Sequence, residues 1–422
     1  MSALPLQLLP DNSSVLDDGS LAVAGVPVAD IAAEFGTPLF VYDEDHLRSR
    51  CREAVAAFGD GVAYATKAFL SVAMARLAHE EGMHLDVATG GELHVALSAG
   101  VPGDRLVMHG NNKSSAELEA AIDGGVARIV VDSFDELDRI EAIVEGGRSV
   151  PDVLVRVNPG VDAHTHEYLT TGVADSKFGF GLESGSANRA VERARASAAM
   201  NLVGLHAHIG SQVFAVDSFE RAIGALAPFV NSLDLPELSV GGGLGVAYVA
   251  GETAPSITEW GKVVHDACQG AGIRARITAE PGRAIVATGS ITVYTVGTIK
   301  RIDGVRTYVS VDGGMSDNPR PVLYGSGYEA FLPRDVMADR DLEVRVVGKH
   351  CESGDVIVSN ASVPTDIAVG DLLATPVTGA YGFSMGSNYN LVPRPAVVFV
   401  AEGQAELVVR RETMDDLLSR DV

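Results

Sequence analysis

Apolar runs rich in β-branched residues recur along the first two-thirds of the chain, and each ends in small or polar residues. Eight such runs precede residue 285: GVAYATKA, HLDVATGG, RLVMHGNN, RIVVDS, DVLVRVNPG, LVGLHAHIG, ELSVGGG and RITAEPGR. The segments between them are amphipathic and rich in alanine, with Ser or Gly at their ends, as in SVAMARLAHEEG, GELHVALSAG, SAELEAAIDGG and SFDELDRIEAIVEGG. Eight alternating strands and helices predict a (β/α)8, or TIM, barrel.

The pattern changes after residue 285 to strands separated by turns: GSITVYTVGTI, RTYVSVDGG, DLEVRVVGKH, DVIVSN, DLLATPV and PAVVFVAEGQAELVVR. These runs predict an antiparallel β domain. Near the N-terminus, VLDDGSLAVAGVPV indicates a short strand and turn that could join this second domain. We therefore predict a barrel over residues 38–285 and a β-sandwich or β-barrel domain made of residues 1–37 and 286–422.

Residues capable of chemistry gather at the predicted carboxyl ends of the barrel strands, where barrel enzymes place their active sites. They are Lys67, Asp86 with Thr89, His109 with Asn111, Asp132, Asn158, His206 with His208, the glycines at 241–243, and Glu280. An open, doubly wound sheet is the alternative fold. Because these residues are distributed over all the predicted strand ends, a closed barrel is favoured over an open sheet.

The net charge and the apolar segments of the chain indicate which partners and which cellular location to expect. Of the 422 residues, 32 are Lys or Arg and 56 are Asp or Glu, which gives a formal net charge of −24. Such a charge repels phosphate backbones and anionic lipids, so we expect neither nucleic acid nor a membrane as partner. The N-terminus MSALPLQLLPDNSS lacks the features of a signal peptide, and no apolar run is long enough to span a bilayer. We expect a cytoplasmic protein.

The chain contains three cysteines, Cys51, Cys268 and Cys351. Their odd number and wide spacing argue against a disulfide framework and fit a reducing compartment. Cys51 and Cys268 lie in helix-like stretches, where packing explains them. Cys351 differs, because it stands in GKHCESGDVI beside acidic and small residues.

Lys67 ends the apolar strand of VAYATKAFL. Burial there would lower the pKa of its ammonium toward a neutral, nucleophilic amine, which suits Schiff-base chemistry. A lysine that reaches solvent from a strand end is the structural alternative.

Two further segments could bind the ends of an aromatic, phosphorylated ligand. GGGLG at 241–245 lets a backbone approach a phosphate closely, although a tight turn explains the glycines equally well. Glu280 in ITAEPGR could hold a pyridine nitrogen protonated, or could form an ion pair with Arg283.

HAHIGSQ places His206 and His208 two residues apart, which suggests zinc. In barrel zinc hydrolases such a pair typically opens the first strand, whereas here it lies on the sixth. His109, Asp132 and Asp86 are possible further ligands. The competing role is an imidazole stacked on a flat cofactor, with Ser211 touching its phosphate. Together with the lysine, the glycines and the glutamate, this combination indicates a pyridoxal phosphate site and no metal.

The chain resembles the fold-type III pyridoxal phosphate decarboxylases through YATKA, HGNNKS, DSKFGF, HAHIGSQ, GGGLG, EPGR, DGGMSDNPRPVLYG, CESGD and GAYGFSMGSNYN. These motifs run in family order from about residue 60 to 390. The resemblance implies an alanine racemase-like architecture, in which the β domain includes the N-terminal strand. It also implies a homodimer with active sites shared between subunits. HTH at 164–166 lies in the long connection after the fifth strand. This connection could be a lid over the site or a plain surface loop.

The resemblance assigns a role to each matching residue. Lys67 forms the Schiff base with pyridoxal 5'-phosphate, His208 stacks on its ring, and Cys351 returns a proton to the substrate carbon. The remaining cofactor contacts are Asp86, Ser211, Gly243, Glu280, Pro281, Gly282, Arg283 and Tyr381. The expected substrate contacts are Arg283, Arg320, Tyr324, Glu352 and Tyr381.

The reaction that the resemblance implies is the decarboxylation of meso-2,6-diaminopimelate to L-lysine and CO2, the last step of lysine biosynthesis. Glu352 would bind the distal amino group, and arginines would bind the distal carboxylate. Three alternatives remain: a relative that acts on ornithine, lysine, arginine or carboxynorspermidine, a catalytically silent relative, and a zinc hydrolase.

Overall fold

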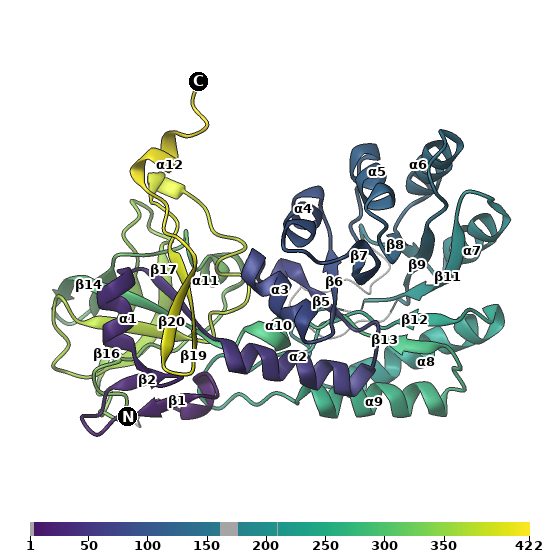
Figure 1. Cartoon of the computed structure of the whole chain (residues 1–422). Helices are drawn as coiled ribbons and strands as arrows, with labels where there is room; N and C mark the ends of the chain where they lie inside the picture. Colours follow the sequence, from purple (N-terminus) through teal and green to yellow (C-terminus); the bar gives the residue numbers. More distant parts are fainter. Residues whose placement is uncertain (1–3, 161–175, 209) are drawn as a thin grey trace. The chain divides into compact units, whose positions relative to one another are not determined.

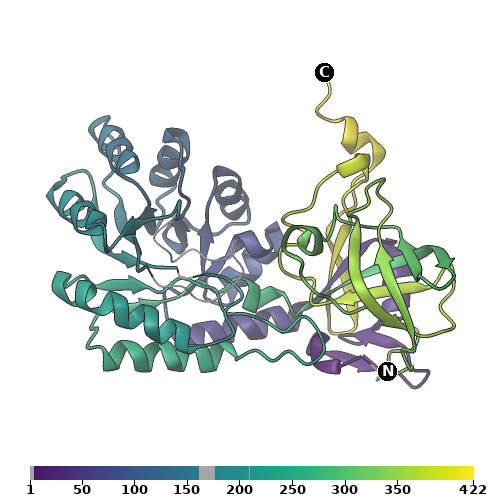
Figure 2. The ribbon, with the colours of Figure 1, turned by 180° about the vertical axis from the view of Figure 1, so that it is seen from behind.

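The computed structural model describes residues 4–160, 176–208 and 210–422, and the chain divides into two compact units (Figure 1, Figure 2). The first unit comprises Arg50–Gly245 and Ala254–Ala284. The second comprises Met1–Ser49, Val246–Thr253 and Ile285–Val422. The predicted boundaries differ from these units at residues 38–49, 246–253 and 285.

Eight parallel strands form the sheet of the first unit, in the spatial order β13-β12-β11-β9-β8-β7-β6-β5. Their bounds are β5 Ala63–Ala65, β6 His84–Val87, β7 Leu106–Met108, β8 Arg128–Val131, β9 Asp152–Asn158, β11 Asn201–His206, β12 Glu237–Ser239 and β13 Arg276–Thr278. The N–H groups of Ala63 and Ala65 donate to the carbonyls of Ala279 (2.9 Å) and Pro281 (3.1 Å), which directly follow β13. The two ends of the sheet therefore meet, and the predicted barrel is confirmed.

Each of the eight predicted runs overlaps one barrel strand, and β11 begins one residue before its run. The short strand β10 (Phe180–Gly181) pairs with β9 outside the ring. The segment at 164–166, considered above as a lid, lies outside the described residues.

Helices cover the outside of the strand ring (Figure 1). They are α3 Val72–Glu80, α4 Gly90–Ser98, α5 Ser115–Asp123, α6 Phe134–Glu145, α7 Ser186–Ala196, α8 Asp217–Leu233 and α9 Ile257–Gly270. Side-chain hydroxyls accept a backbone N–H of the first turn at five helix starts, namely Ser71, Thr89, Ser114, Ser133 and Ser256. Each such cap stabilises its helix by about 1 kcal/mol. Ser71 and Ser133 begin two of the predicted helical segments, so local chemistry fixed these helix starts.

The second unit contains a sheet in the order β17-β16-β15-β14-β4-β19-β20, with β18 also paired to β14. The bounds are β4 Leu39–Asp43, β14 Ser290–Ile302, β15 Arg306–Val311, β16 Leu342–Val347, β17 Val356–Val363, β18 Leu372–Pro376, β19 Ala396–Ala401 and β20 Gln404–Val409. The prediction of an antiparallel domain was wrong in two places, because β15 pairs with β16, and β4 with β19, in parallel. Both pairs are joined by long connections, which parallel pairing requires.

Strand β4 was not anticipated, although all five of its residues are buried. It lies between β14 and β19, far from both in sequence, and its hydrophobic run packs into a core with Leu21, Ile291, Phe331 and Val398. The N-terminal segment predicted as strand and turn forms a separate sheet of β1 Ser13–Val15, β2 Leu21–Val23 and β3 Val26–Pro27.

The remaining helices are α1 Val28–Phe35, α2 Glu44–Phe58, α10 Arg283–Val286, α11 Arg320–Tyr324 and α12 Met414–Leu418. Across residues 4–160, 176–208 and 210–422, no helix has both the length and the apolar character needed to cross a membrane.

Candidate active site

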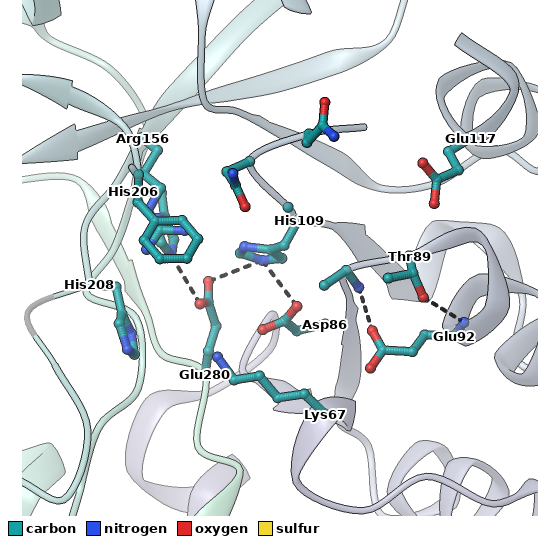
Figure 3. A pocket seen from close by; sticks show the side chains of 15 residues that line it. Lys67, Asp86, Thr89, Glu92, His109, Glu117, Arg156, His206, His208 and Glu280 are labelled. Carbon is teal, nitrogen blue, oxygen red and sulfur yellow. Dashed lines mark hydrogen bonds and ion pairs between the residues drawn. The ribbon is translucent and has the colours of Figure 1, made fainter. Parts of the chain in front are cut away.

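A pocket of about 410 Å³ opens at the carboxyl ends of the barrel strands (Figure 3). The described residues that line it are Lys67, Asp86, Ala88, Thr89, Glu92, His109, Gly110, Asn111, Asn112, Glu117, Arg156, Phe178, His206, His208 and Glu280. The sequence predicted chemistry at this end of the barrel, and the pocket is located there.

Lys67 extends into this pocket from a 3-10 turn, Thr66–Ala68, that directly follows β5. The prediction that its ammonium would be buried was wrong, because the side chain is exposed. Its neighbours Thr66 and Ala68 are buried, and the Thr66 hydroxyl donates to the carbonyl oxygen of Asp86 at 2.8 Å. The backbone is therefore anchored while the amine remains accessible to a ligand.

Glu280, just after β13, is a buried carboxylate with two hydrogen-bond donors. The Ser239 hydroxyl donates to Oε1 at 2.7 Å, and His206 Nε2 lies 2.9 Å from Oε2. Burial opposes the ionisation of Glu280, but the nearby His206 and the hydrogen bonds from His206 and Ser239 outweigh it and hold the pKa of Glu280 well below its ordinary value. The pocket thus contains a fixed negative charge.

The pKa of Asp86, at the end of β6, is shifted in the opposite direction to that of Glu280. Burial, and then the charge of Glu280, raise its pKa well above the usual value, while the Lys67 ammonium opposes the rise. His109 lies between the two carboxyl groups, with Nε2 3.7 Å from Asp86 Oδ1 and 3.5 Å from Glu280 Oε1. Burial lowers the pKa of His109 well below its usual value, so the imidazole is neutral near pH 7.

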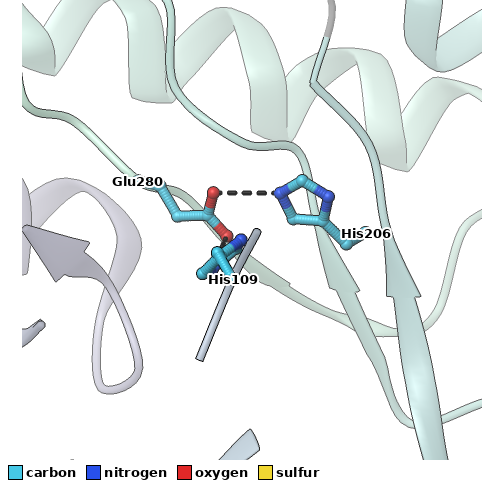
Figure 4. A group of neighbouring side chains, drawn as sticks. All are labelled: His109, His206 and Glu280. Carbon is cyan, nitrogen blue, oxygen red and sulfur yellow. Dashed lines mark hydrogen bonds and ion pairs between the residues drawn. The ribbon is translucent and has the colours of Figure 1, made fainter. Parts of the chain in front are cut away.

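The zinc interpretation paired His206 with His208, but the two imidazoles have different partners. His206 contacts Glu280, whereas His208 Nδ1 accepts the N–H of Gly242 at 3.1 Å. The group that does converge is His109, His206 and Glu280, whose ligating atoms lie within 4.8 Å of one another (Figure 4). Any metal hypothesis therefore applies to this group and not to the histidine pair.

The three glycines at 241–243 are required by the chain's own backbone. A Cβ atom on Gly242 would lie 2.2 Å from the carbonyl oxygen of Glu280, and one on Gly243 would lie 2.3 Å from that of Gly210. Gly243 also has φ +111°, a conformation that residues with side chains rarely adopt. Close packing of the loops after β11, β12 and β13 is thus sufficient to explain the glycines.

Ser211 and Arg283 meet beside these loops. Arg283 Nη2 donates to Ser211 Oγ at 3.0 Å, and Arg283 is buried. The ion pair between Glu280 and Arg283 that the sequence left open is not among the salt bridges of the described residues, since Glu280 bonds His206 and Ser239 instead.

Arg156 lines the pocket and received no role in the sequence analysis. Its guanidinium lies 3.5 Å from Asp132 Oδ2 and 4.4 Å from the centre of the Phe178 ring, and burial lowers its pKa. A charged residue inside the apolar run VLVRVN was the signal that could have identified it. Glu92, which also lines the pocket, was missed as well; it accepts the N–H of Ala88 at 2.6 Å.

Pro281 and Gly282 directly follow Glu280 in the first unit, and the remaining predicted site residues lie in the second unit. Cys351 and Glu352 are exposed in the turn between β16 and β17, and the N–H of Cys351 donates to Asn390 Oδ1 at 3.0 Å. Arg320 begins α11 and is buried, with Nη1 2.5 Å from the Tyr328 hydroxyl and its guanidinium 4.2 Å from the centre of the Tyr248 ring. The last two predicted residues, Tyr324 and Tyr381, are half-buried.

Asp355 ties the Cys351 turn to the segment DGGMSDN. Its Oδ2 accepts the N–H of His350 at 2.8 Å, and its Oδ1 accepts that of Met315 at 2.7 Å. His350 Nε2 lies 2.8 Å from Ser316 Oγ, which adds a second link between the two segments. The position of the Cys351 backbone therefore depends on contacts that the sequence motifs alone did not reveal.

Asp317 makes a testable contribution to stability. Burial raises its pKa to about 7 from 3.8, against hydrogen bonds from Tyr294 and Gly314. Because the folded-state pKa is raised, ionisation disfavours the folded state increasingly as pH rises from about 4 through 7. We expect the stability of Asp317→Asn relative to the parent chain to increase between pH 5 and pH 8 by up to about 3 kcal/mol in unfolding free energy. An unchanged difference between the two proteins across that range would contradict this assignment.

Comparison with known proteins agrees with this geometry. A family model described as Pyridoxal-dependent decarboxylase, pyridoxal binding domain, matches residues 44–287. The diaminopimelate decarboxylase of Mycobacterium tuberculosis (strain ATCC 25618 / H37Rv) is 50% identical, over 98% of this chain and 97% of that protein. The protein of that name from Bacillus subtilis (strain 168) is 44% identical, over 96% and 95%.

A solved structure is similar over both units. The diaminopimelate decarboxylase from M. jannaschii, in co-complex with L-lysine, superposes with a TM-score of 0.91 at 31% sequence identity, over 98% of each chain. Because the family model spans more than half of the sequence and the relatives match over nearly their whole length, the chain belongs to the diaminopimelate decarboxylases, within the pyridoxal-dependent decarboxylase family.

Proposed function

We propose that this chain catalyses the decarboxylation of meso-2,6-diaminopimelate to L-lysine and CO2, the last step of lysine biosynthesis. Identity of 50% to a diaminopimelate decarboxylase over 98% of the chain is the observation that carries this conclusion. The cofactor is pyridoxal 5'-phosphate, as the family requires. The L-lysine in the M. jannaschii complex corresponds to the product of the proposed reaction.

The residues of the barrel pocket fit this cofactor. Lys67 offers an accessible amine for its aldehyde, and Glu280 offers a carboxylate that remains ionised although it is buried. Arg283 and Ser211 supply hydrogen-bond donors that suit a phosphate. When bound, the cofactor accepts the electron pair that the substrate carbon retains as CO2 leaves.

The chain's own side chains would divide the remaining work. Lys67 would hold the cofactor covalently, and Glu280 would keep its ring nitrogen protonated. His208 stacks on the ring. The phosphate end is bound by Ser211, Gly243, Gly282 and Arg283, with Asp86, Pro281 and Tyr381 as further cofactor contacts.

The second unit would supply proton return and substrate selection. Cys351 is the exposed thiol among the three free cysteines, and it would protonate the substrate carbon. Glu352 would bind the distal amino group of the substrate. Arg320 and Arg283, with Tyr324 and Tyr381, would bind the distal carboxylate.

We infer a homodimer in which the Cys351 turn of one subunit completes the pocket of the other. We also infer a cytoplasmic location, which free cysteines and the absence of disulfides among the described residues support. The net charge of −24 supports a small-molecule substrate over nucleic acid or a membrane surface.

The first test is release of CO2 and L-lysine by the purified, cofactor-loaded protein. We expect turnover of meso-diaminopimelate to exceed that of L-ornithine, L-lysine and L-arginine by at least about three orders of magnitude in kcat/KM, because a site built for the distal groups rejects substrates that lack them. Preference for one of the simple amino acids would overturn the distal assignment. Zinc content measured on the same sample, if stoichiometric and required for turnover, would favour the metal alternative at His109, His206 and Glu280.

A further inference from the structure

Three side chains that have no role in the proposed reaction surround the carboxylate of Glu280. They come from separate barrel strands: His109 follows β7, His206 ends β11, and Ser239 ends β12. Figure 4 shows the two histidines beside Glu280. Ser239 and His206 each contact one oxygen of Glu280, at 2.7 Å and 2.9 Å. The carboxylate is thus held from two directions.

His206 presents a hydrogen-bond donor to Glu280. Its Nε2 faces Glu280, while Nδ1 is buried and has no hydrogen-bond partner among the described residues. An ionised carboxylate can only accept a hydrogen bond, so the ring nitrogen that faces Glu280 must carry a hydrogen. We therefore assign the proton to Nε2, from which it is donated to Glu280.

His109 closes the third side and separates Glu280 from a second buried carboxyl group. Its Nε2 also has no hydrogen-bond partner within the described part of the chain, although it lies 3.5 Å from Glu280 Oε1 and 3.7 Å from Asp86 Oδ1. Its ring meets that of His206 edge to face, with centroids 5.1 Å apart. The two imidazoles therefore pack together against one face of the site.

We propose that His206, supported by His109 and Ser239, is a positioning residue that holds Glu280 in place as the anionic partner of the cofactor's ring nitrogen. This inference rests on the proposed function, since it deepens the role given to Glu280. The other charged or titratable groups that line the pocket are Lys67, Asp86, Glu92, Glu117, Arg156 and His208. Among the described residues, none of these is within hydrogen-bonding distance of the Glu280 carboxylate.

The role predicts a specific coupling between His206 and the ring nitrogen. If His206 acts through Glu280, its loss weakens binding of a cofactor that contains the nitrogen and leaves an analogue without the nitrogen nearly unaffected. If His206 only supports the fold, both ligands lose affinity equally. This comparison is a chemical version of a double-mutant cycle.

The experiment measures the dissociation constants of pyridoxal 5'-phosphate and of its analogue in which C–H replaces the ring nitrogen, for cofactor-free protein. Both ligands have the aldehyde and the phosphate, so their covalent linkage to Lys67 is the same. For His206→Leu we expect pyridoxal 5'-phosphate to bind about ten-fold more weakly, the usual effect of losing a hydrogen bond to a charged group, and the analogue to change by less than about two-fold.

His206→Gln is the matched control, because its amide can place an N–H donor near the position of Nε2. We expect it to bind pyridoxal 5'-phosphate within about three-fold of the parent chain. Equal losses for the two ligands in His206→Leu, or no loss for either, would overturn the inference. Far-ultraviolet circular dichroism of each variant checks that it is folded.

Ser239→Ala provides the same test if His206→Leu does not fold. It removes the donor to Oε1, so we expect about a five-fold loss for pyridoxal 5'-phosphate and less than about two-fold for the analogue. Equal effects on both ligands would overturn the inference here too. A parent chain that binds pyridoxal 5'-phosphate without decarboxylating any substrate would refute the proposed function, while the binding comparison would still decide the role of His206.

Discussion

Replacing Lys67 with alanine is expected to lower turnover of meso-diaminopimelate by about three orders of magnitude or more, because covalent catalysis through its amine is lost. Among the described residues that line the pocket, Lys67 is the one lysine. Its side chain is exposed, so the amine can reach a bound ligand without a change in the fold. Steady-state release of CO2 measures the effect.

A chemical readout accompanies this prediction. Borohydride reduction of the loaded parent protein followed by peptide mass spectrometry should place the cofactor on the peptide that contains Lys67. Lys262→Ala is the control, since Lys262 is an exposed lysine on α9 that pairs with Asp266. Full activity of Lys67→Ala, or a cofactor attached to another lysine, would refute the mechanism.

Replacing Cys351 with alanine is expected to lower kcat by about two to three orders of magnitude and to change KM by less than about three-fold. The thiol is exposed in its turn, and we assign it the return of a proton to the substrate carbon, a step that follows binding. Cys268→Ala is the matched control. Burial raises the pKa of Cys268 to about 11, so this thiol serves packing and its loss should leave kcat unchanged. A large rise in KM with unchanged kcat in Cys351→Ala would instead indicate a binding role.

The two inactive variants together test whether subunits share active sites. Equal amounts of Lys67→Ala and Cys351→Ala, dissociated and reassociated, should recover up to about a quarter of the parent activity, because roughly half of the dimers are mixed and each mixed dimer has one intact site. If one chain supplied both residues, every site would lack one of them and no activity would return.

Local patterns in the sequence were sufficient for most of the barrel. Short apolar runs and the serines that begin α3 and α6 depend on neighbouring residues, so the eight strands and these helix starts could be predicted one segment at a time. The location of chemistry at the strand ends followed from the barrel itself. The motifs, through their family resemblance, then supplied roles for residues such as Lys67, Glu280 and Cys351.

Features that depend on distant contacts were missed or misjudged. Strand β4 pairs with β14 and β19, which lie more than 200 residues away, and the parallel pairing of β15 with β16 depends on the path of a long connection. The exposure of Lys67 depends on the burial of its neighbours Thr66 and Ala68, which fixes the backbone on either side of it. The local pattern of apolar and polar residues does not predict these pairings or this exposure, because both are set by the packing of segments that are distant in the sequence.

The sequence by itself determined the alternation of strands and helices, the end of the barrel that holds the chemistry, and the membership of the family. Only the tertiary structure decided which side chains surround Glu280. His206 contacts its carboxylate, His109 separates it from Asp86, and Ser239 donates the second hydrogen bond. The physical reason is closure of the barrel. It brings residues from β6, β7, β11, β12 and β13 to within a few ångströms, so each side chain's partners and ionisation depend on the whole ring.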